Sequence, residues 1–275
     1  MHRRDFLTTA AGAAGAALAA APAPLAAQPT AAQPNAARRA VYELRTYELR
    51  NDLDVRRAHA FFEQALVPAL GRAGAGPVGV FTPESGLPQP SVVVLVPYPS
   101  MTDAGLAAER LAADAGYRAA SDAWERGAAG SAGRLPYVRY SAALYRAFAG
   151  HPALEVPPAP AGRAGRLFEL RTYEAPSEAG LRAKVAMFDQ EEIRIFREAG
   201  FRNVFFGEAV AGERLPHLTY LIAFDDMAAR AAAWGRFGAH PDWQRVRTRP
   251  GWTDPEAVSS IRAAFLRPTA YSAVR

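Results

Sequence analysis

One sequence pattern occurs twice in this chain, and that repeat limits the fold more than any other feature. The segment Tyr42–Glu48 (Tyr-Glu-Leu-Arg-Thr-Tyr-Glu) returns as Phe168–Glu174 (Phe-Glu-Leu-Arg-Thr-Tyr-Glu), 126 positions later. The offset then stays constant without a gap. Pairs related by it include Phe62 and Phe188, Gly74 and Gly200, Gly86 and Gly212, and Tyr117 and Trp243. A constant offset over so many positions indicates two copies of one structural unit.

Each copy predicts the element order β-α-β-β-α-β. Alternating β-forming residues indicate the strands, and helical spacing of apolar residues indicates the helices. In the first copy we expect strands at 41–49, 77–82, 91–97 and 136–147 and a long helix at about 101–126. In the second we expect strands at 167–174, 202–209, 216–224 and 258–267 and a helix at 226–238. This order is that of the ferredoxin-like, or split βαβ, unit.

The apolar runs Val92–Val96 and Leu218–Phe224 show how the copies should pack. They place apolar side chains on both faces of their strands, so both faces of each sheet should be buried. The other copy's sheet is the obvious cover. We therefore predict an α+β fold in which two ferredoxin-like β-α-β-β-α-β repeats pack sheet to sheet as a pseudo-twofold α+β barrel. Pairing of each copy with a partner chain, and hence a homo-oligomer, is the alternative.

The first 27 residues have the order of a signal peptide. Arg3 and Arg4, followed after one residue by Phe-Leu, closely resemble the twin-arginine export motif, and a weakly hydrophobic Ala/Gly run leads to a small-residue site before Gln28. A membrane-anchoring helix is the alternative, but glycines and prolines make the segment too short and too soft to span well. We expect cleavage at or near Ala27, a periplasmic or secreted protein, and no stable membrane insertion after cleavage.

These features divide the chain into five predicted segments. They are a signal peptide at 1–27, a disordered lead-in at 28–40, repeat 1 at 41–148, a linker rich in proline and glycine at 149–165, and repeat 2 at 166–275.

Composition argues against several classes of site. The chain has no cysteine, which rules out disulfides, thiolate metal sites and a cysteine nucleophile. Its net charge of +5 comes from 32 basic and 27 acidic residues that form no basic stripe, so we predict no nucleic-acid partner. Its five histidines include no pair four residues apart, so a helical zinc motif is absent. We predict neither a metal nor a cofactor.

Polar trios on the first strand of each copy are the main candidate site. Strand periodicity places Glu169, Arg171 and Tyr173 on one face. Because such a face should not easily meet the helices, we expect it to line the space between the sheets or the barrel mouth. An arginine there can hold a carboxylate or phosphate through two hydrogen bonds. The alternative is an internal ion pair, since buried charges need partners. The equivalent trio of the first copy is Glu43, Arg45 and Tyr47.

His217 is the remaining candidate. It begins an apolar strand, where it could act as an acid–base group or donate a capping hydrogen bond. The sequence places no carboxylate partner beside it, and a lone histidine is more often structural. We therefore include His217 with the two trios as ligand-binding residues and assign no catalytic residue.

With these strands in place, the chain resembles the NIPSNAP family over roughly residues 41–275. The second copy carries the stronger match, in Glu169–Tyr173, Leu215–Tyr220, Trp234–Phe237, His240–Trp243 and Arg267–Ser272. The first copy keeps Glu43–Tyr47 but has Ser91 and Tyr117 in place of the His and Trp. The resemblance implies a fold similar to dimeric α+β barrel proteins, which include cofactor-free monooxygenases, isomerases and haem proteins. It implies no settled reaction.

Three functions are compatible with these residues. The first is an exported NIPSNAP-like protein that binds a small organic ligand, with an organic acid as one option, between its repeats. The second is a cofactor-independent monooxygenase or isomerase that uses Arg171, Tyr173 and His217. The third is a structural assembly module. A cavity on the face of Glu169 that His217 also reaches would favour the first two.

Overall fold

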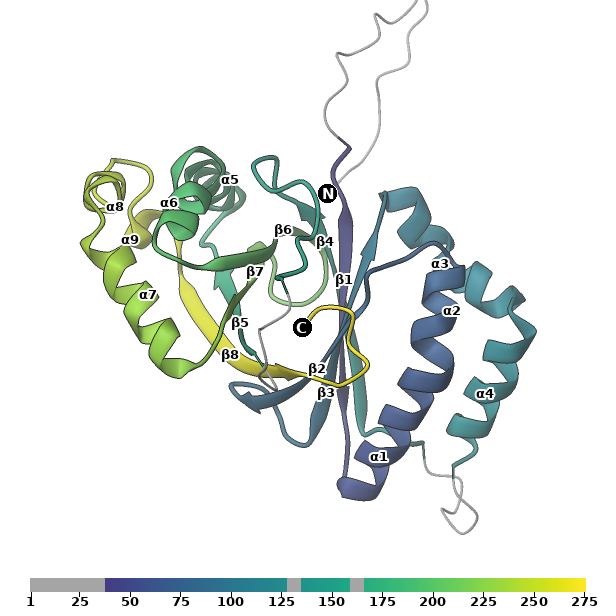
Figure 1. Cartoon of the computed structure of the whole chain (residues 1–275). Coiled ribbons are helices and arrows are strands. Elements are labelled where there is room, and N and C mark those ends of the chain that lie inside the picture. The colour runs from purple at the N-terminus through teal and green to yellow at the C-terminus, as the bar shows by residue number, and fades with distance from the viewer. Residues whose placement is uncertain (1–37, 128–134, 159–165) are drawn as a thin grey trace, which may run out of the picture. The chain divides into compact units, whose positions relative to one another are not determined.

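The structure is a computed structural model and describes residues 38–127, 135–158 and 166–275 (Figure 1). Its strands are β1 (Val41–Glu48), β2 (Gly79–Ser85), β3 (Ser91–Tyr98), β4 (Arg139–Ala147), β5 (Leu167–Glu174), β6 (Arg202–Ala211), β7 (His217–Phe224) and β8 (Ser260–Pro268). Its helices are α1 (Asp52–Phe61), α2 (Val67–Arg72), α3 (Met101–Ala113), α4 (Ala115–Glu125), α5 (Glu178–Met187), α6 (Ile193–Glu198), α7 (Met227–Ala239), α8 (Pro241–Val246) and α9 (Asp254–Ala257). π-helical turns at Phe62–Leu66 and Phe188–Glu192 join α1 to α2 and α5 to α6.

The strands form one closed antiparallel barrel in the order β1-β3-β2-β8-β5-β7-β6-β4. Repeat 1 contributes the sheet β4-β1-β3-β2 and repeat 2 the sheet β8-β5-β7-β6, each in the ferredoxin-like order. The two sheets face each other and are also hydrogen-bonded along both edges, where β2 pairs with β8 and β4 with β6. The predicted pseudo-twofold α+β barrel is confirmed, and its closure leaves none of the eight described strands with a free edge.

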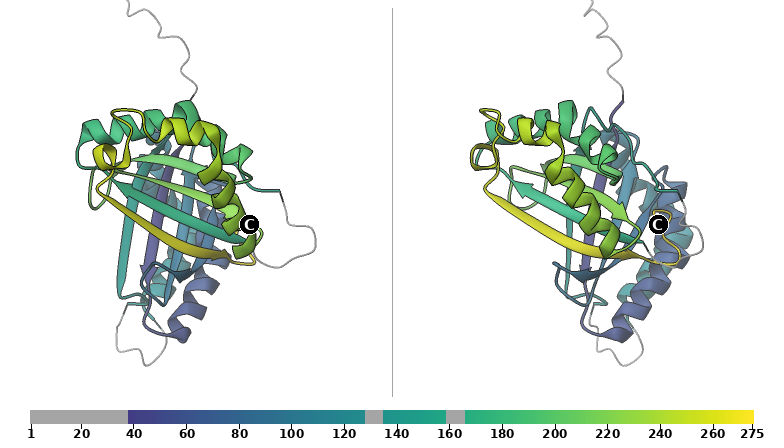
Figure 2. Two further views of the ribbon diagram at one scale, coloured as in Figure 1. Left: turned by 90° about the vertical axis from the view of Figure 1, so that its left-hand side faces the viewer. Right: turned by 60° about the vertical axis from the view of Figure 1, so that its left-hand side comes forward.

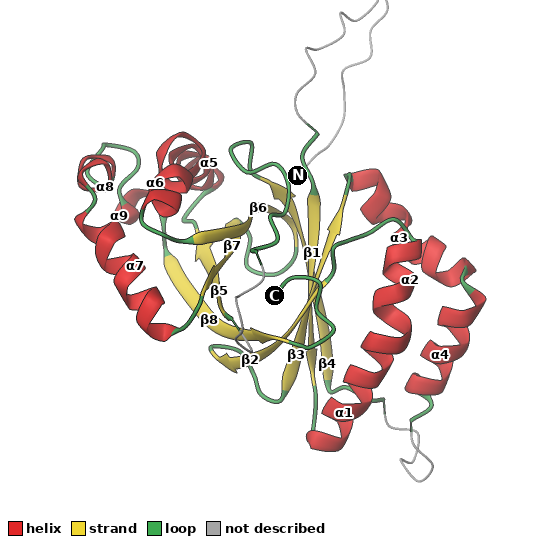
Figure 3. Cartoon of the chain, in the orientation of Figure 1, coloured by secondary structure: helices red, strands yellow, loops and turns green. Residues whose placement is uncertain are grey.

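Two helical layers cover the barrel from outside. Helices α1–α4 lie against one side and α5–α9 against the other, as Figures 2 and 3 show. Strand periodicity divides the apolar side chains accordingly. In β3, Val93 and Leu95 point into the barrel, whereas Val92, Val94 and Val96 pack against the helices of repeat 1. The barrel interior is thus a third core, built by both repeats.

The long helix expected at 101–126 is interrupted at Asp114. Asp114 leaves the helical conformation, and its Oδ1 accepts a hydrogen bond of 2.9 Å from the Tyr117 backbone N–H, which starts α4. In repeat 2 the same break falls at His240, directly before Pro241. The helix is therefore interrupted at the same position in both repeats. Only repeat 2 has a proline there, so only in repeat 2 does the sequence indicate the interruption.

The segments that flank the repeats lie partly outside the described residues. The predicted signal peptide, residues 28–37 of the predicted lead-in and residues 159–165 of the predicted linker fall there. The Ala40 backbone N–H donates to the Pro152 carbonyl over 2.8 Å, and the Glu155 N–H donates to the Val204 carbonyl over 2.9 Å. The described part of the linker is thus hydrogen-bonded to the barrel. None of the described helices has the length and apolar character needed to cross a membrane.

Candidate functional site

The trio Glu169, Arg171 and Tyr173 lies between β5 and the helices, not inside the barrel. The fully buried Glu169 carboxylate accepts a hydrogen bond of 2.8 Å from Arg171. Two side chains of α7 also donate to it: Arg230 over 2.7 and 2.8 Å, and the Trp234 indole N–H over 3.1 Å. The expectation that this face lines the space between the sheets is therefore wrong.

Complementary groups on α7 explain this placement. Burial alone would raise the pKa of Glu169, but the hydrogen bonds from Arg230 and Trp234 and the charge of Arg171 lower it overall. Glu169 is thus an ionised carboxylate bound by two guanidinium groups. This arrangement resembles the internal ion pair that was the alternative prediction for the trio. Arg230 and Trp234 are four residues apart, so both lie on the same face of α7. This spacing could have predicted from the sequence that they contact the same group.

The trio Glu43, Arg45 and Tyr47 also faces the helices. Arg45 donates through Nε and Nη2 to the two oxygens of Glu43, each over 2.8 Å. The Tyr98 hydroxyl donates to Glu43 Oε2 over 2.9 Å. Tyr47 is buried in an aromatic cluster and contacts Phe62, with ring centroids 4.9 Å apart. The expectation of an inward-facing trio is thus wrong in this repeat as well.

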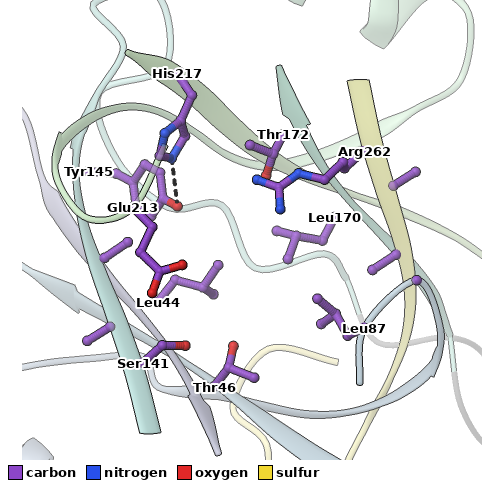
Figure 4. Close-up of a pocket in the computed structure, with 15 residues that line it drawn as sticks. Leu44, Thr46, Leu87, Ser141, Tyr145, Leu170, Thr172, Glu213, His217 and Arg262 are labelled. Atoms are coloured by element: carbon purple, nitrogen blue, oxygen red, sulfur yellow. Dashed lines mark hydrogen bonds between the residues drawn. The ribbon is translucent and has the colours of Figure 1, made fainter. Parts of the chain in front are cut away.

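A cavity of about 190 Å³ lies inside the barrel, at the end that carries the β2–β3 and β6–β7 turns (Figure 4). Leu44, Leu87, Ala143, Leu170 and Ala264 form its apolar wall. Its polar wall consists of Thr46, Ser141, Tyr145, Thr172, Glu213, His217 and Arg262. The volume exceeds the roughly 150 Å³ of a cavity that holds benzene, so the site has room for a single-ring molecule.

A glycine lets the β2–β3 turn close over this cavity. Gly86 has a φ of +80°, and a Cβ atom at this position would lie 2.7 Å from the Ala264 Cα atom. A larger residue would therefore push the turn away from β8, since that distance is shorter than real Cβ contacts.

His217 and Tyr145 form a hydrogen-bonded pair in the cavity wall. The Tyr145 hydroxyl lies 3.2 Å from His217 Nε2, and His217 Nδ1 lies 3.2 Å from the Arg214 carbonyl oxygen. Because a carbonyl only accepts, Nδ1 carries the proton, which leaves Nε2 to accept from Tyr145. One partner comes from β4 of repeat 1 and the other from β7 of repeat 2, so the pair exists only because the barrel closes.

Burial determines the protonation of both partners. It lowers the pKa of His217, and the nearby positive charge of Arg262 acts in the same direction. Burial also raises the pKa of the Tyr145 hydroxyl. At neutral pH the pair is thus an uncharged imidazole beside an un-ionised phenol.

Thr172 and Arg262 of the cavity wall also have hydrogen-bond or charge partners. The hydroxyls of Thr172 and Thr219 lie 2.9 Å apart. The half-exposed Arg262 guanidinium forms an ion pair with Glu174 over 3.1 Å. Figure 4 shows Arg262 and Thr172 on the side of the cavity opposite Glu213 and Ser141. Within the described ranges, no three His, Asp or Glu side chains gather in a way that could hold a metal ion.

The pseudo-twofold axis relates positions in this cavity that differ chemically. The offset of 126 relates Glu213 to Leu87 and His217 to Ser91. The strand registers relate Arg262, which pairs with Thr172, to Ser141, which pairs with Thr46. Tyr145 pairs with Tyr42, and Leu266 pairs with the equivalent residue Phe168. Tyr145 and Leu266 are therefore equivalent positions too. The cavity is therefore asymmetric, with most of its titratable groups from repeat 2.

Sequence reasoning found one residue of this cavity and missed the others. His217 lies in it, whereas both trios lie on the opposite faces of their strands. Tyr145, Thr172, Glu213 and Arg262 were not predicted. Thr172 could have been found, because it alternates with the trio and must face the other way.

The NIPSNAP family model matches residues 42–130 and 168–273, most of both repeats. The chain belongs to the NIPSNAP family. A NIPSNAP family protein of unknown function from Agrobacterium tumefaciens is 20% identical to it, over 40% of this chain and 94% of that protein, with a TM-score of 0.36. A comparison with curated proteins finds no match.

Solved structures also share the barrel of this NIPSNAP protein. A candidate monooxygenase from Lactobacillus acidophilus aligns over 83% of this chain and 94% of its own, with a TM-score of 0.55 and 6% identity. A second candidate monooxygenase, from Fusobacterium nucleatum, aligns over 84% and 93%, with a TM-score of 0.51 and 6% identity. At such identity these likenesses concern the fold alone.

Proposed function

We propose that this NIPSNAP protein binds a small organic acid or phenol in the barrel cavity between its two repeats. The observation that carries the proposal is the hydrogen-bonded pair of His217 and Tyr145 in the wall of a ring-sized cavity. A few placed polar groups within a largely apolar wall are typical of small-molecule sites.

The composition of the walls defines the ligand class. The leucine and alanine side chains favour an apolar ring, and the Tyr145 oxygen, whose proton is donated to His217, can accept a hydrogen bond from a ligand hydroxyl. Arg262, which is paired with Glu174 and lies on the side of the cavity opposite Glu213, adds a positive charge at the rim, where its guanidinium can bind a carboxylate. Benzoate and 4-hydroxybenzoate combine these features at the size of the cavity.

Native mass spectrometry and calorimetry with these two acids test the proposal. We expect saturable binding that Thr46→Leu abolishes, because the larger side chain occupies the cavity. The same change at Thr102, an exposed α3 residue, should have no effect. Absence of binding, or equal binding by the Thr46→Leu variant, would contradict the proposal and favour a structural assembly module.

A matched pair of arginines tests the role of charge. Arg262 pairs with Glu174 over 3.1 Å, and Arg139 pairs with Glu48, the equivalent glutamate of repeat 1, over 3.3 Å. Only Arg262 lines the cavity. Arg262→Gln should weaken benzoate binding about tenfold, whereas Arg139→Gln should leave it unchanged.

The His217–Tyr145 pair also favours a second candidate function, proton transfer. The Tyr145 hydroxyl oxygen can accept an acidic proton from a bound substrate while its own proton passes to His217 Nε2. In an isomerase the proton would return to another atom, and in a cofactor-independent monooxygenase the resulting carbanion would react with O₂. Deuterium uptake from D₂O, or oxygen consumption, by a panel of phenolic and ketonic acids tests this candidate, with His217→Gln as the inactive control.

We also propose that the protein acts in the periplasm or outside the cell. The support is the N-terminal order of Arg3 and Arg4, a weakly hydrophobic run and a small-residue site before Gln28. Cell fractionation tests this proposal. Replacing both arginines by lysine should retain the chain in the cytoplasm, and unchanged export would contradict the twin-arginine route.

A further inference from the structure

A second cavity, open to solvent, lies between the sheet of repeat 1 and helices α3 and α4, and it shares only Ala142 with the lining of the barrel cavity. It measures about 650 Å³. The partly buried pair of Glu43 and Arg45 lies at its sheet wall, together with Tyr140 of β4. Alanines of α3, including Ala104 and Ala108, line the helical wall.

In repeat 2 the corresponding space is filled by side chains of α7. The constant offset relates Ala104 to Arg230 and Ala108 to Trp234. In repeat 2 the Arg230 guanidinium and the Trp234 indole lie over the pair formed by Glu169 and Arg171. In repeat 1 two methyl groups stand at these positions, and a cavity remains over Glu43 and Arg45.

The two glutamates differ in how many hydrogen bonds they accept. An ionised carboxylate offers about four acceptor positions. Glu169 accepts four hydrogen bonds, none longer than 3.1 Å. Glu43 accepts two from Arg45 and one from Tyr98, all within 2.9 Å, and its fourth neighbour is the Tyr140 hydroxyl at 3.5 Å. One acceptor position of Glu43 Oε1 is therefore weakly used.

The arginines differ in a parallel way. The Arg171 guanidinium lies 4.8 Å from the centre of the Trp234 ring, a favourable cation–π distance. Ala108 stands where Trp234 would be, so this ring has no counterpart on α3 beside Arg45. An aromatic ring in the cavity could take that position.

The charges around the cavity favour a cation. Its charged lining groups are Glu43, Asp122, Glu125, Arg45 and Arg118. Three acidic and two basic side chains give a net charge of −1. In repeat 2 a second guanidinium, that of Arg230, occupies the corresponding place, so a positive group is compatible with this type of carboxylate site.

We propose that this cavity binds an organic cation with a planar guanidinium or amidinium group on an aromatic ring. The planar cation takes the place of the Arg230 guanidinium and donates to Glu43, and the ring takes the place of the Trp234 indole over Arg45. The ligand thus supplies to repeat 1 what α7 supplies to repeat 2.

Calorimetric titration of the full chain with benzamidine tests this proposal. We expect one saturable site per chain, and Ala108→Trp should weaken binding about tenfold or more because the indole fills the cavity. Ala113→Trp, at an exposed α3 position that does not line the cavity, should stay within about twofold of the wild type. Circular dichroism verifies that both variants are folded.

The outcomes separate this site from the barrel cavity. Thr46→Leu, which fills the barrel cavity, should leave benzamidine binding unchanged. Benzoate, the matched anion, should not compete with benzamidine. No benzamidine binding by the wild type, binding unaffected by Ala108→Trp, or competition by benzoate would overturn the proposal.

Discussion

The two repeats carry the same polar strand but cover it differently. In repeat 2, Arg230 and Trp234 of α7 complete the hydrogen bonding of Glu169. In repeat 1 the equivalent α3 positions are alanines, and a cavity of about 650 Å³ remains. The same strand pattern, repeated within one chain, thus forms a packed ionic core in repeat 2 and the wall of a cavity in repeat 1.

A second buried pair shows the same division. Lys184 of α5 and Glu192 of the following π-helical turn, both almost fully buried, lie 3.6 Å apart in repeat 2. Their equivalents in repeat 1 are Ala58 and Leu66, which belong to an apolar core. Repeat 2 therefore has the more polar helix-side interior, and its charges contact one another.

Inside the barrel the repeats share one cavity. Repeat 1 contributes Tyr145 and Ser141, and repeat 2 contributes His217 and Arg262. Neither repeat alone could build this wall. The two repeats thus form a joint cavity between them, and repeat 1 has a separate space of its own.

Removal of the shared carboxylate should give the largest difference between the repeats. Glu169→Gln leaves the charges of Arg171 and Arg230 without an anion and should cost roughly 3–5 kcal/mol of unfolding free energy. Glu43→Gln affects only one guanidinium and should cost about 1–3 kcal/mol. Urea unfolding of both variants measures the comparison, and equal losses would contradict it.

The double variant Arg230→Ala/Trp234→Ala gives repeat 2 the side chains of repeat 1. We expect a loss of roughly 2–4 kcal/mol, because a partly buried indole and a guanidinium are removed. The variant should also bind a second benzamidine molecule, which calorimetry would detect as a doubled stoichiometry. If a folded variant still binds one benzamidine molecule, a glutamate–arginine pair covered by alanines is not sufficient to form a benzamidine site.

A smaller effect is expected at the barrel cavity. Tyr145→Phe removes the hydroxyl that donates to His217 Nε2 and should cost about 0.5–1.5 kcal/mol. Tyr140→Phe removes a hydroxyl whose distance to Glu43 is 3.5 Å, and should cost less than about 0.5 kcal/mol. Thermal unfolding of the two variants compares them, and the reverse order would contradict the hydrogen bonding described for Tyr145.

The smallest effect is a pH dependence. Burial lowers the folded-state pKa of His217, so the unfolded chain binds a proton more readily. The stabilising contribution of the neutral imidazole is full above the ordinary value of 6.5, and it is lost as the pH falls from 6.5 through the lower folded-state pKa. His59 and His151 shift in the same direction, so the test compares the wild type with His217→Gln. A stability difference independent of pH between 5 and 8 would contradict the shift.

The fold could be predicted from the sequence because its signals are periodic and repeated. Alternation along 41–49 and 167–174 and the constant offset define the strands and their order. The direction of the polar trios could not be predicted in the same way. Periodicity shows that Glu169 and Arg171 share a face, but the side to which that face turns depends on α7.

The barrel cavity was less accessible to sequence reasoning. His217 was found as a polar residue at the start of an apolar strand. Its partner Tyr145 lies 72 positions away in the other repeat, and the pairing of β4 with β6 brings the two together. Such a contact depends on the closure of the barrel, so no pattern within a short stretch of sequence can predict it.

Imidazole NMR of His217 is the most direct test of a ligand site between the repeats. We expect 4-hydroxybenzoate to shift the His217 resonances saturably in the full chain and to leave them in place in the Thr46→Leu variant. Resonances that do not move with the ligand, or that move equally in the two proteins, would contradict a binding site in the barrel cavity.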